Sequence, residues 1–449
     1  MTAVSELPTA SSENESAGVT PFLDARAFNR LSIIVTAWAS LTMFVEGFEM
    51  QLVGYAAPAM LGALHVGKAE FGAIFGAGNF GFFLGALSLS ALGDRFGRRR
   101  LIVCGVLMFS ICTIAAAFGS TVAELSVLRF CAGIGLGGAV PNAISLTAEY
   151  APQQNRASRI TLLYVTYVLG GAGAGLLASW LIPMFGWQII FTIGGWGGLA
   201  CGVLLYFYVP ESMAFLAQRK SMADASALAG VQDGGDIAPA VAVVAKPAAR
   251  IPFVALFTDG RIVVTLLLWC SYVAALMASQ FITSWLPTLI AGTGVSISLA
   301  ALIGSLYHVG GAAGNIIMGY LTDRRGLKII AIGFAVAAPV TACMGFVSTT
   351  LPLLALATLT VGVLMVGSLN GINAASSMLY PTAMRASGVG WMNGVGRVGS
   401  IIGPVVGGIL ISSNMSMTNL FLVLAAPIAV TALFTGGLAL VSLRSRVST

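Results

Sequence analysis

The chain has 449 residues, of which 57% are apolar and only 8% are charged, and its mean hydropathy is +0.93. Ordinary soluble proteins carry roughly 25% charged residues, so this composition excludes a soluble enzyme with a water-filled cleft and predicts a polytopic membrane protein. The six cysteines are scattered through apolar runs, which excludes a disulfide-stabilised secreted scaffold.

Apolar segments long enough to cross about 30 Å of hydrocarbon follow one another along the chain. Residues 1–30 are polar and predict a cytoplasmic tail. Six spans are predicted over 31–57, 69–92, 101–119, 123–149, 158–182 and 187–209. After a polar cytoplasmic segment, 211–260, six more are predicted over 261–290, 297–321, 328–347, 352–379, 387–412 and 417–442. The sequence therefore predicts an all-α membrane protein with twelve transmembrane helices in two six-helix bundles, 31–210 and 261–443, and a cytoplasmic tail, 444–449.

The 22 lysines and arginines are distributed unevenly among the predicted loops. Nearly all lie in the two tails, in the central segment or in loops on the same side of the membrane. The exceptions are Lys68, in an opposite loop, and Arg129 and Arg397, within spans. Basic residues mark the cytoplasmic side of membrane proteins, so both termini are predicted to be cytoplasmic. The same asymmetry explains the net charge of +6 without a nucleic-acid partner.

Two motifs occur once in each half. Gly-Asp-Arg-Phe-Gly-Arg-Arg-Arg follows the second span and Thr-Asp-Arg-Arg-Gly follows the eighth, with Asp94 and Asp323 229 positions apart. Tyr150 and Tyr380, each followed within six residues by Arg-Ala-Ser, are 230 positions apart. Two motif pairs at nearly one offset indicate a duplicated half. Such a loop can join helix ends through charge and helix-dipole contacts, so a gating or structural role is predicted for Asp94, Arg95, Gly97, Arg98, Asp323 and Arg324.

These motifs resemble those of the major facilitator superfamily over essentially the whole chain. The Asp-Arg-x-Gly-Arg-Arg pattern lies between the second and third spans, as in that family, although Ser90 stands where glycine is usual. Arg129-x₃-Gly-x-Gly-x-Gly in the fourth span and Pro-Glu-Ser at 210–212 are further matches. The resemblance implies the fold described above and transport by alternating access.

The first span suggests a subgroup. Glu46-Gly47-Phe48-Glu49 resembles the paired-acid motif of aromatic acid:proton symporters, in which aspartates are commoner, and Gln51 and residues 137–142 are similar to the hydroxybenzoate and hydroxyphenylpropionate branch. The resemblance implies proton-coupled uptake of an aromatic carboxylate across a bacterial inner membrane. It implies no enzyme activity, cofactor or metal, and a monomer is expected.

The acidic residues of the first span predict a proton-coupling cluster. Glu46 and Glu49 are three positions apart, so a helix places them on one side. An ionised carboxylate within a span costs at least about 2.5 kcal/mol, so both are expected to face a central cavity. Arg129 is expected about 9 Å below the outer end of its span, at the depth of the two glutamates. We predict that these three residues couple protons to transport, with a static ion pair as the alternative.

Arg397 is predicted to bind a substrate carboxylate. It lies near the membrane midplane, and no acidic residue within the spans of its own half can pair with it. A planar guanidinium matches a carboxylate at two points; packing against backbone carbonyls is the alternative. The surrounding Gly-x-Gly-x-x-Gly pattern has no preceding strand, which excludes a dinucleotide site.

Other polar and aromatic residues within spans are candidates for substrate binding: His308, Tyr164, Tyr167, Tyr272, Asn373 and Asn393. For His308, a hydrogen-bonded core position is an equal alternative. Trp187 and Trp285 lie near span ends and are expected in the interfacial aromatic belt.

Other functions remain open at this point. A proton antiporter could export small organic acids or drugs, a symporter could carry a non-aromatic organic anion, and a sensor could bind a ligand without transport. The fifth span lacks the Gly-Pro pair typical of facilitator antiporters, which argues against drug efflux. His65 and His308 are far apart in sequence and indicate no metal centre.

Overall fold

The computed structural model describes residues 25–219, 256–258, 261–381, 384–413 and 415–447. Within that part of the chain, twelve helices are long and apolar enough to span a membrane, as the hydropathy predicted. The first six are α1 (Ala25–Leu64), α2 (Lys68–Phe96), α3 (Arg98–Ala116), α4 (Val122–Tyr150), α5 (Arg156–Phe185) and α6 (Gln188–Tyr208). The others are α8 (Ile262–Ala291), α9 (Ile297–Arg325), α10 (Leu327–Phe346), α11 (Leu351–Leu379), α12 (Arg385–Ser412) and α13 (Met417–Val447). The predicted tail before residue 25 and most of the predicted central segment lie outside the described residues.

Each predicted span corresponds to one helix, because hydrocarbon offers no partner to backbone polar groups and an α-helix satisfies them internally. Local sequence features determine where some of the helices begin and end. Thr121 and Glu124 form a reciprocal capping box at the start of α4. Gly97 separates α2 from α3 with a φ of 98°, a conformation that favours glycine.

The two halves repeat one packing arrangement. A Cβ on Gly81 of α2 would lie 2.1 Å from the carbonyl oxygen of Phe130 in α4. A Cβ on Gly310 of α9 would lie 2.2 Å from the carbonyl oxygen of Leu359 in α11. Both glycines, and both of their partners, are 229 positions apart, the offset of the two loop aspartates. Glycine lets the backbones approach this closely, so the same close crossing is built into each half and the predicted duplication is confirmed.

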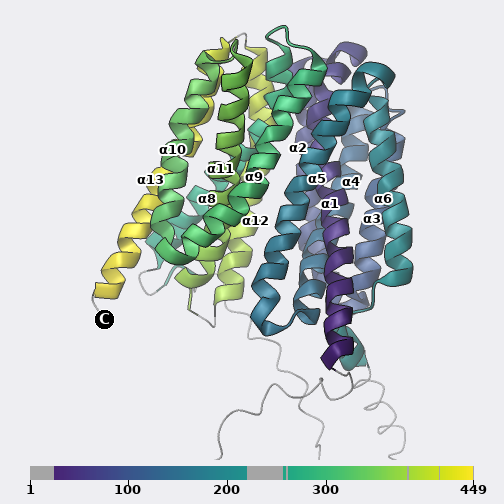
Figure 1. Cartoon of the computed structure of the whole chain (residues 1–449), viewed down its shortest axis with the longest axis vertical. Coiled ribbons are helices and arrows are strands. Elements are labelled where there is room, and N and C mark those ends of the chain that lie inside the picture. The colour runs from purple at the N-terminus through teal and green to yellow at the C-terminus, as the bar shows by residue number, and fades with distance from the viewer. Residues whose placement is uncertain (1–24, 220–255, 259–260, 382–383, 414, 448–449) are drawn as a thin grey trace, which may run out of the picture.

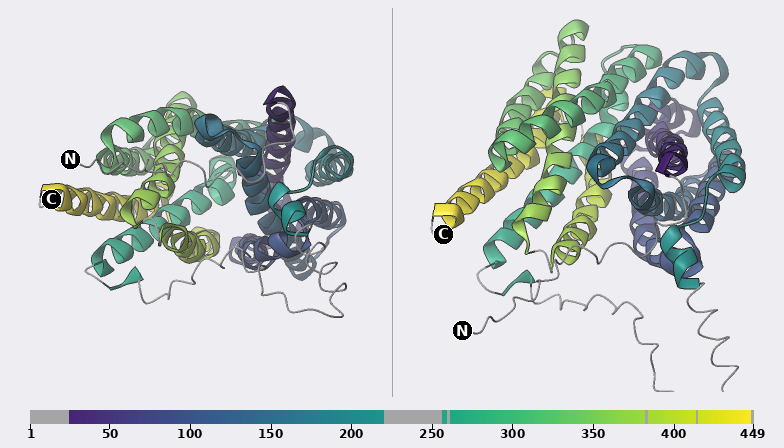
Figure 2. Two further views of the ribbon diagram at one scale, coloured as in Figure 1. Left: turned by 90° about the horizontal axis from the view of Figure 1, so that it is seen from below. Right: turned by 60° about the horizontal axis from the view of Figure 1, so that its bottom comes forward.

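The helices form two bundles, α1–α6 and α8–α13, that lie side by side and diverge toward the side on which α1 begins and α13 ends (Figures 1 and 2). On the opposite side the bundles touch. There Gly408 of α12 approaches the backbone of Lys68 in α2, and Gly54 of α1 approaches that of Thr283 in α8. The structure is therefore closed on the side away from the described chain ends.

Trp285 lies within this closed contact. The side chain is completely buried, its indole Nε1 donates a hydrogen bond to the Pro404 carbonyl oxygen (2.8 Å), and its ring packs edge-on against Phe71 and Phe75 of the other bundle. Trp187 is also buried, against Phe191. The expectation that these two tryptophans belong to an exposed interfacial belt is wrong, because proximity to a span end does not reveal which side of a helix meets its neighbours.

Candidate functional site

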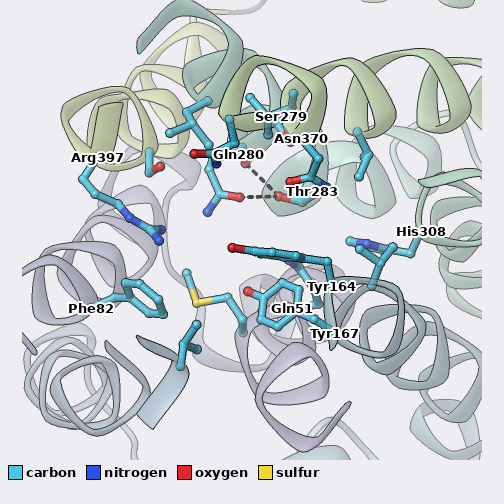
Figure 3. A pocket seen from close by; sticks show the side chains of 18 of the residues that line it. Gln51, Phe82, Tyr164, Tyr167, Ser279, Gln280, Thr283, His308, Asn370 and Arg397 are labelled. Atoms are coloured by element: carbon cyan, nitrogen blue, oxygen red, sulfur yellow. Dashed lines mark hydrogen bonds between the residues drawn. The ribbon is translucent and has the colours of Figure 1, made fainter. Parts of the chain in front are cut away.

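A cavity of about 200 Å³ lies between the bundles. Its walls come from α1, α2, α4 and α5 on one side and from α8, α9, α11 and α12 on the other. All the residues predicted to bind substrate line it: Arg397, His308, Tyr164, Tyr167, Tyr272, Asn373 and Asn393. In Figure 3, Arg397 and Phe82 lie on one side of the cavity and His308 on the other, with Tyr164 and Tyr167 between them.

Arg397 extends from α12 across to the other bundle. Its guanidinium carbon lies 4.2 Å from the centre of the Phe82 ring in α2, which is a cation–π contact. Among the described residues, no acidic side chain forms an ion pair with it. A positive charge thus faces the cavity without a charged partner, an arrangement suited to an anionic ligand that also carries an aromatic ring.

A neutral polar cluster adjoins Arg397 in the C-terminal bundle. Asn373 Nδ2 donates to the Tyr272 hydroxyl (2.8 Å), Tyr272 donates to Asn393 Oδ1 (3.1 Å), and Asn393 Nδ2 donates to Asn373 Oδ1 (3.0 Å). Asn393 and Arg397 are one helical turn apart on α12. The cluster gives this wall of the cavity hydrogen-bonding groups without adding charge.

Further polar groups line the cavity that the sequence had not singled out as ligands: Gln51, Ser279, Gln280 and Thr283. Each lies within a predicted span, where uncharged polar residues are also common in helix contacts. The sequence therefore showed these polar residues within the spans, but it did not distinguish a ligand-binding role from a role in helix packing.

Two of the three residues of the predicted acid cluster, Glu49 and Arg129, form an ion pair inside the N-terminal bundle. Arg129 Nη1 lies 3.5 Å from Glu49 Oε2, and Arg129 Nη2 donates to the Glu49 backbone carbonyl (3.1 Å). Thr113 of α3 donates to the same carboxylate oxygen (2.7 Å). Glu49 is completely buried and Arg129 nearly so. Buried ion pairs depend on additional hydrogen bonds. Thr113 and the Glu49 backbone carbonyl supply two here, whereas Glu49 Oε1 and Arg129 Nη1 have no hydrogen-bond partner among the described residues.

Glu46 is buried without such support. Neither carboxylate oxygen has a hydrogen-bond partner among the described residues, and the side chain has no exposed surface. It is within electrostatic range of the Tyr167 hydroxyl on α5 and the Cys201 thiol on α6. A buried, unpartnered polar group is costly, so Glu46 does not stabilise the bundle through a hydrogen bond or an ion pair among the described residues.

The expectation that both glutamates face the central cavity is wrong, since neither lines it. Successive helix residues advance by about 100°. The cavity-lining side of α1 carries Met43, Met50 and Gln51, so Glu49 projects from nearly the opposite side. The spacing of the two acids correctly indicated a common side of the helix, but not the direction in which that side points.

A second, smaller cavity lies between the acid pair and the central one. Arg129 and Asn79 line it from the N-terminal bundle, and Gln280 lines both cavities. Gln280 Nε2 of α8 donates to Asn79 Oδ1 of α2 (2.9 Å), a hydrogen bond between the bundles. Arg129 of the acid pair thus lines the same small cavity as Gln280, a residue that also lines the central cavity.

The loop motif is built into a network in the first half. Arg98 forms an ion pair with Glu149 at the end of α4, and Glu149 accepts a hydrogen bond from Ser212 (2.7 Å). The backbone N–H of Arg99 donates to Glu211 (3.0 Å), whose own carbonyl accepts from Tyr150 (2.7 Å). The motif and the Pro-Glu-Ser segment therefore join the ends of α2, α3, α4 and α6. Glu149 was not predicted to take part.

The other motif residues are arranged differently. Arg95 is exposed, and the side chain of Asp94 lies outside the described part. In the second half, Asp323 and Arg324 are exposed, and the Arg324 guanidinium lies 4.3 Å from the centre of the Tyr320 ring of its own helix. The repeat is thus present in sequence in both halves, whereas the contacts of its described side chains differ between them.

Comparison with known proteins identifies the family of the chain. The model of the Major Facilitator Superfamily matches residues 39–292 and 268–447. The chain is 35% identical to a gallate transporter from Pseudomonas putida over 91% of this chain and 92% of that protein. It is 34% identical to the 4-hydroxybenzoate transporter PcaK from Acinetobacter baylyi (92% and 93%) and 30% identical to a 3-(3-hydroxy-phenyl)propionate transporter from Escherichia coli (91% and 93%).

Solved structures share the fold at lower identity. A D-xylose-proton symporter matches with a TM-score of 0.69 at 16% identity, over 90% of this chain and 97% of the other. The nucleoside transporter NupG matches with a TM-score of 0.65 at 16% identity, over 91% and 98%. The helices, the duplicated halves and these matches agree: the chain belongs to the Major Facilitator Superfamily and is a multi-pass membrane transporter.

Proposed function

We propose that the protein takes up an aromatic carboxylate together with protons across a bacterial inner membrane. The observation that carries the proposal is the guanidinium of Arg397, which faces a cavity shared by both bundles, lies over the ring of Phe82 and has no acidic partner among the described residues. Relatives named as gallate, 4-hydroxybenzoate and hydroxyphenylpropionate transporters support the same substrate class.

Recognition follows from the chemistry of the cavity wall. The carboxylate binds the guanidinium at two points, and the ligand ring packs among Phe82, Tyr164 and Tyr167. Tyr272, Asn373 and Asn393 supply neutral hydrogen-bonding groups beside the charge. One chain supplies both walls of this cavity, so a monomer is sufficient for transport.

The direction of the opening follows from the charge asymmetry of the loops. With both termini in the cytoplasm, the side on which the bundles touch faces outward, and the protein is in an inward-facing conformation. Alternating access then requires the two bundles to rock about the cavity, separating the contact around Trp285 and closing the opposite side.

Proton coupling would meet the energetic cost of uptake. A monoanion entering a cell that is negative inside moves uphill by about 2.3 kcal/mol per 100 mV. A proton gradient returns about 1.4 kcal/mol per pH unit for each proton carried. Glu46 and the Glu49–Arg129 pair are the proposed proton sites. Protonation of Glu49 weakens its attraction to Arg129, a residue that also lines the small cavity beside Gln280.

The test is uptake of labelled 4-hydroxybenzoate and gallate by proteoliposomes under an imposed pH gradient. Wild-type protein is expected to accumulate label when the outside is acidic. Arg397→Ala is expected to lose uptake through weakened binding, and Glu46→Gln through lost proton coupling. Full accumulation by both variants would contradict the mechanism. Gradient-driven export in place of uptake would favour the antiport alternative.

A further inference from the structure

A second set of polar groups lies along the cavity wall between Arg397 and His308 (Figure 3). Most of them are already engaged. Ser279 shares a hydrogen bond with the Tyr307 hydroxyl (3.0 Å), Asn370 donates to Asn315 (2.6 Å), and Gln280 donates to Asn79. Such groups contribute to the cavity wall, but their principal partners lie within the protein.

His308 and Gln51 differ from these groups. Both line the cavity, and both are more than nine-tenths buried, at 6% and 8% exposure. Neither side chain makes a hydrogen bond among the described residues. The His308 imidazole is held by ring packing instead: Tyr307 and Tyr55 meet it edge-on, with ring centres 5.4 and 6.3 Å away.

The two side chains also lie beside each other. A Cβ placed on Gly171 of α5 would lie 2.9 Å from Gln51 Cγ and 3.0 Å from His308 Nδ1. Gln51 comes from α1 and His308 from α9, so the pair joins one residue from each bundle over a position where only glycine leaves room. Two unpartnered polar groups therefore converge on the side of the cavity away from the guanidinium.

We propose that His308, with Gln51 beside it, binds a ring hydroxyl of the substrate and so selects hydroxylated aromatic acids over unsubstituted ones. The inference rests on the proposed function, because it requires the carboxylate to bind at Arg397. A neutral imidazole offers one N–H donor and one acceptor nitrogen, and the Gln51 amide offers both as well. A phenolic hydroxyl can donate to one and accept from the other.

The physical basis of selection is the cost of an unsatisfied group. When a ligand that lacks the hydroxyl fills the cavity, it excludes other partners and leaves the imidazole buried without a hydrogen bond. Sites built to bind a hydroxyl discriminate strongly against analogues that lack it. An aromatic acid with no ring hydroxyl is therefore expected to bind at least about tenfold more weakly than its hydroxylated counterpart.

The test compares equilibrium binding of benzoate, 4-hydroxybenzoate and gallate to purified full-length protein by isothermal titration calorimetry. Wild type is expected to prefer the hydroxylated acids by about tenfold or more. His308→Leu is expected to lose that preference, weakening 4-hydroxybenzoate and gallate about tenfold and leaving benzoate within about twofold. Retained benzoate binding also shows that the variant is folded. Gln51→Leu should reduce the preference in the same direction.

Thr341→Ala is the control, because Thr341 of α10 is a buried polar residue that donates to the Ala337 carbonyl and lines neither cavity. It should leave the ratio of the three affinities unchanged. If His308→Leu weakens all three acids equally, or if the wild type shows no preference, the assignment of His308 as the hydroxyl-binding residue is overturned. The proposed function would stand in either case. Failure of the wild type to bind any aromatic acid would overturn this inference and the proposed function together.

Discussion

The two bundles have the same helix arrangement but differ in where their polar and charged side chains lie. The N-terminal bundle encloses Glu46, Glu49 and Arg129 in its own interior, and the two glutamates do not line the central cavity. The C-terminal bundle presents Arg397, His308 and a neutral asparagine–tyrosine cluster to that cavity. Under the proposed function, the proton sites lie in one bundle and most substrate contacts lie in the other.

Such a division requires a physical connection between the bundles. The hydrogen bond from Gln280 to Asn79 crosses between them, beside the small cavity that Arg129 lines. Arg397 makes a second connection through its contact with Phe82. Substitutions in either bundle, and at the contacts between them, can test this difference.

The largest effect is expected from Glu49→Gln. The amide keeps the shape and a hydrogen bond to Thr113 or Arg129 but cannot take up and release a proton. Accumulation driven by a pH gradient should fall by about 100-fold or more, the scale on which an essential proton-transfer group acts, whereas exchange of labelled for unlabelled substrate should persist. In wild type, uptake at constant voltage should rise as external pH falls, and this slope should vanish in the variant. Equal loss of exchange would place Glu49 in substrate binding instead.

The next largest effect is expected from Arg129→Met, and it is an effect on the stability of the folded protein. Removing one partner of a buried ion pair leaves the other uncompensated, at a cost of about 3–5 kcal/mol. The thermal unfolding midpoint in detergent should fall clearly below that of wild type. The double variant Glu49→Gln/Arg129→Met should recover much of the loss, because no unpaired charge remains. A double variant no more stable than Arg129→Met would show that packing, and not charge, dominates at this site.

Gln280→Leu tests the connection between the bundles. Losing one neutral hydrogen bond costs about 1 kcal/mol, which should shift the population away from the conformation closed around Trp285 by about fivefold. Distances between spin labels on α5 and α11, measured by double electron–electron resonance on the side of the chain ends, should report the shift. Ser400→Ala, which leaves the Asn79–Gln280 bond intact, is the control. An unchanged distance distribution would remove Gln280 from the connection.

The smallest effects are expected at the turns of the repeated loop motif. Gly97 (φ 98°, ψ 134°) and Gly326 (φ 63°, ψ −151°) adopt backbone conformations that favour glycine, so alanine costs about 1–3 kcal/mol at each. Only at Gly97 would the added Cβ meet another group, Glu211 Oε2 at 2.5 Å; at Gly326 it meets nothing within 4 Å. Gly97→Ala should therefore lower the unfolding midpoint more than Gly326→Ala. Equal shifts would mean that the first-half network contributes little to stability.

Much of the fold was predictable because the bilayer imposes it locally. A backbone in hydrocarbon must satisfy its own hydrogen bonds, so a long apolar run reports a helix without any knowledge of its neighbours. The 229-residue offset likewise revealed the duplication, which the matching glycine contacts of Gly81 and Gly310 reproduce in space. Arg397 was identifiable because a charge within a span is costly and needs a partner or a ligand.

Tertiary structure alone decided which way each side chain points. Composition and spacing determined twelve spans, two related halves and a small set of charged residues within the membrane, since these depend on local free energies of transfer. They could not determine the rotation of α1 that turns Glu49 toward α3 and α4, the burial of Trp285 between the bundles, or the convergence of Gln51 and His308 beside Gly171. Those features depend on how helices distant in sequence pack together, and a helix's own residues do not specify which of its sides meets a neighbour.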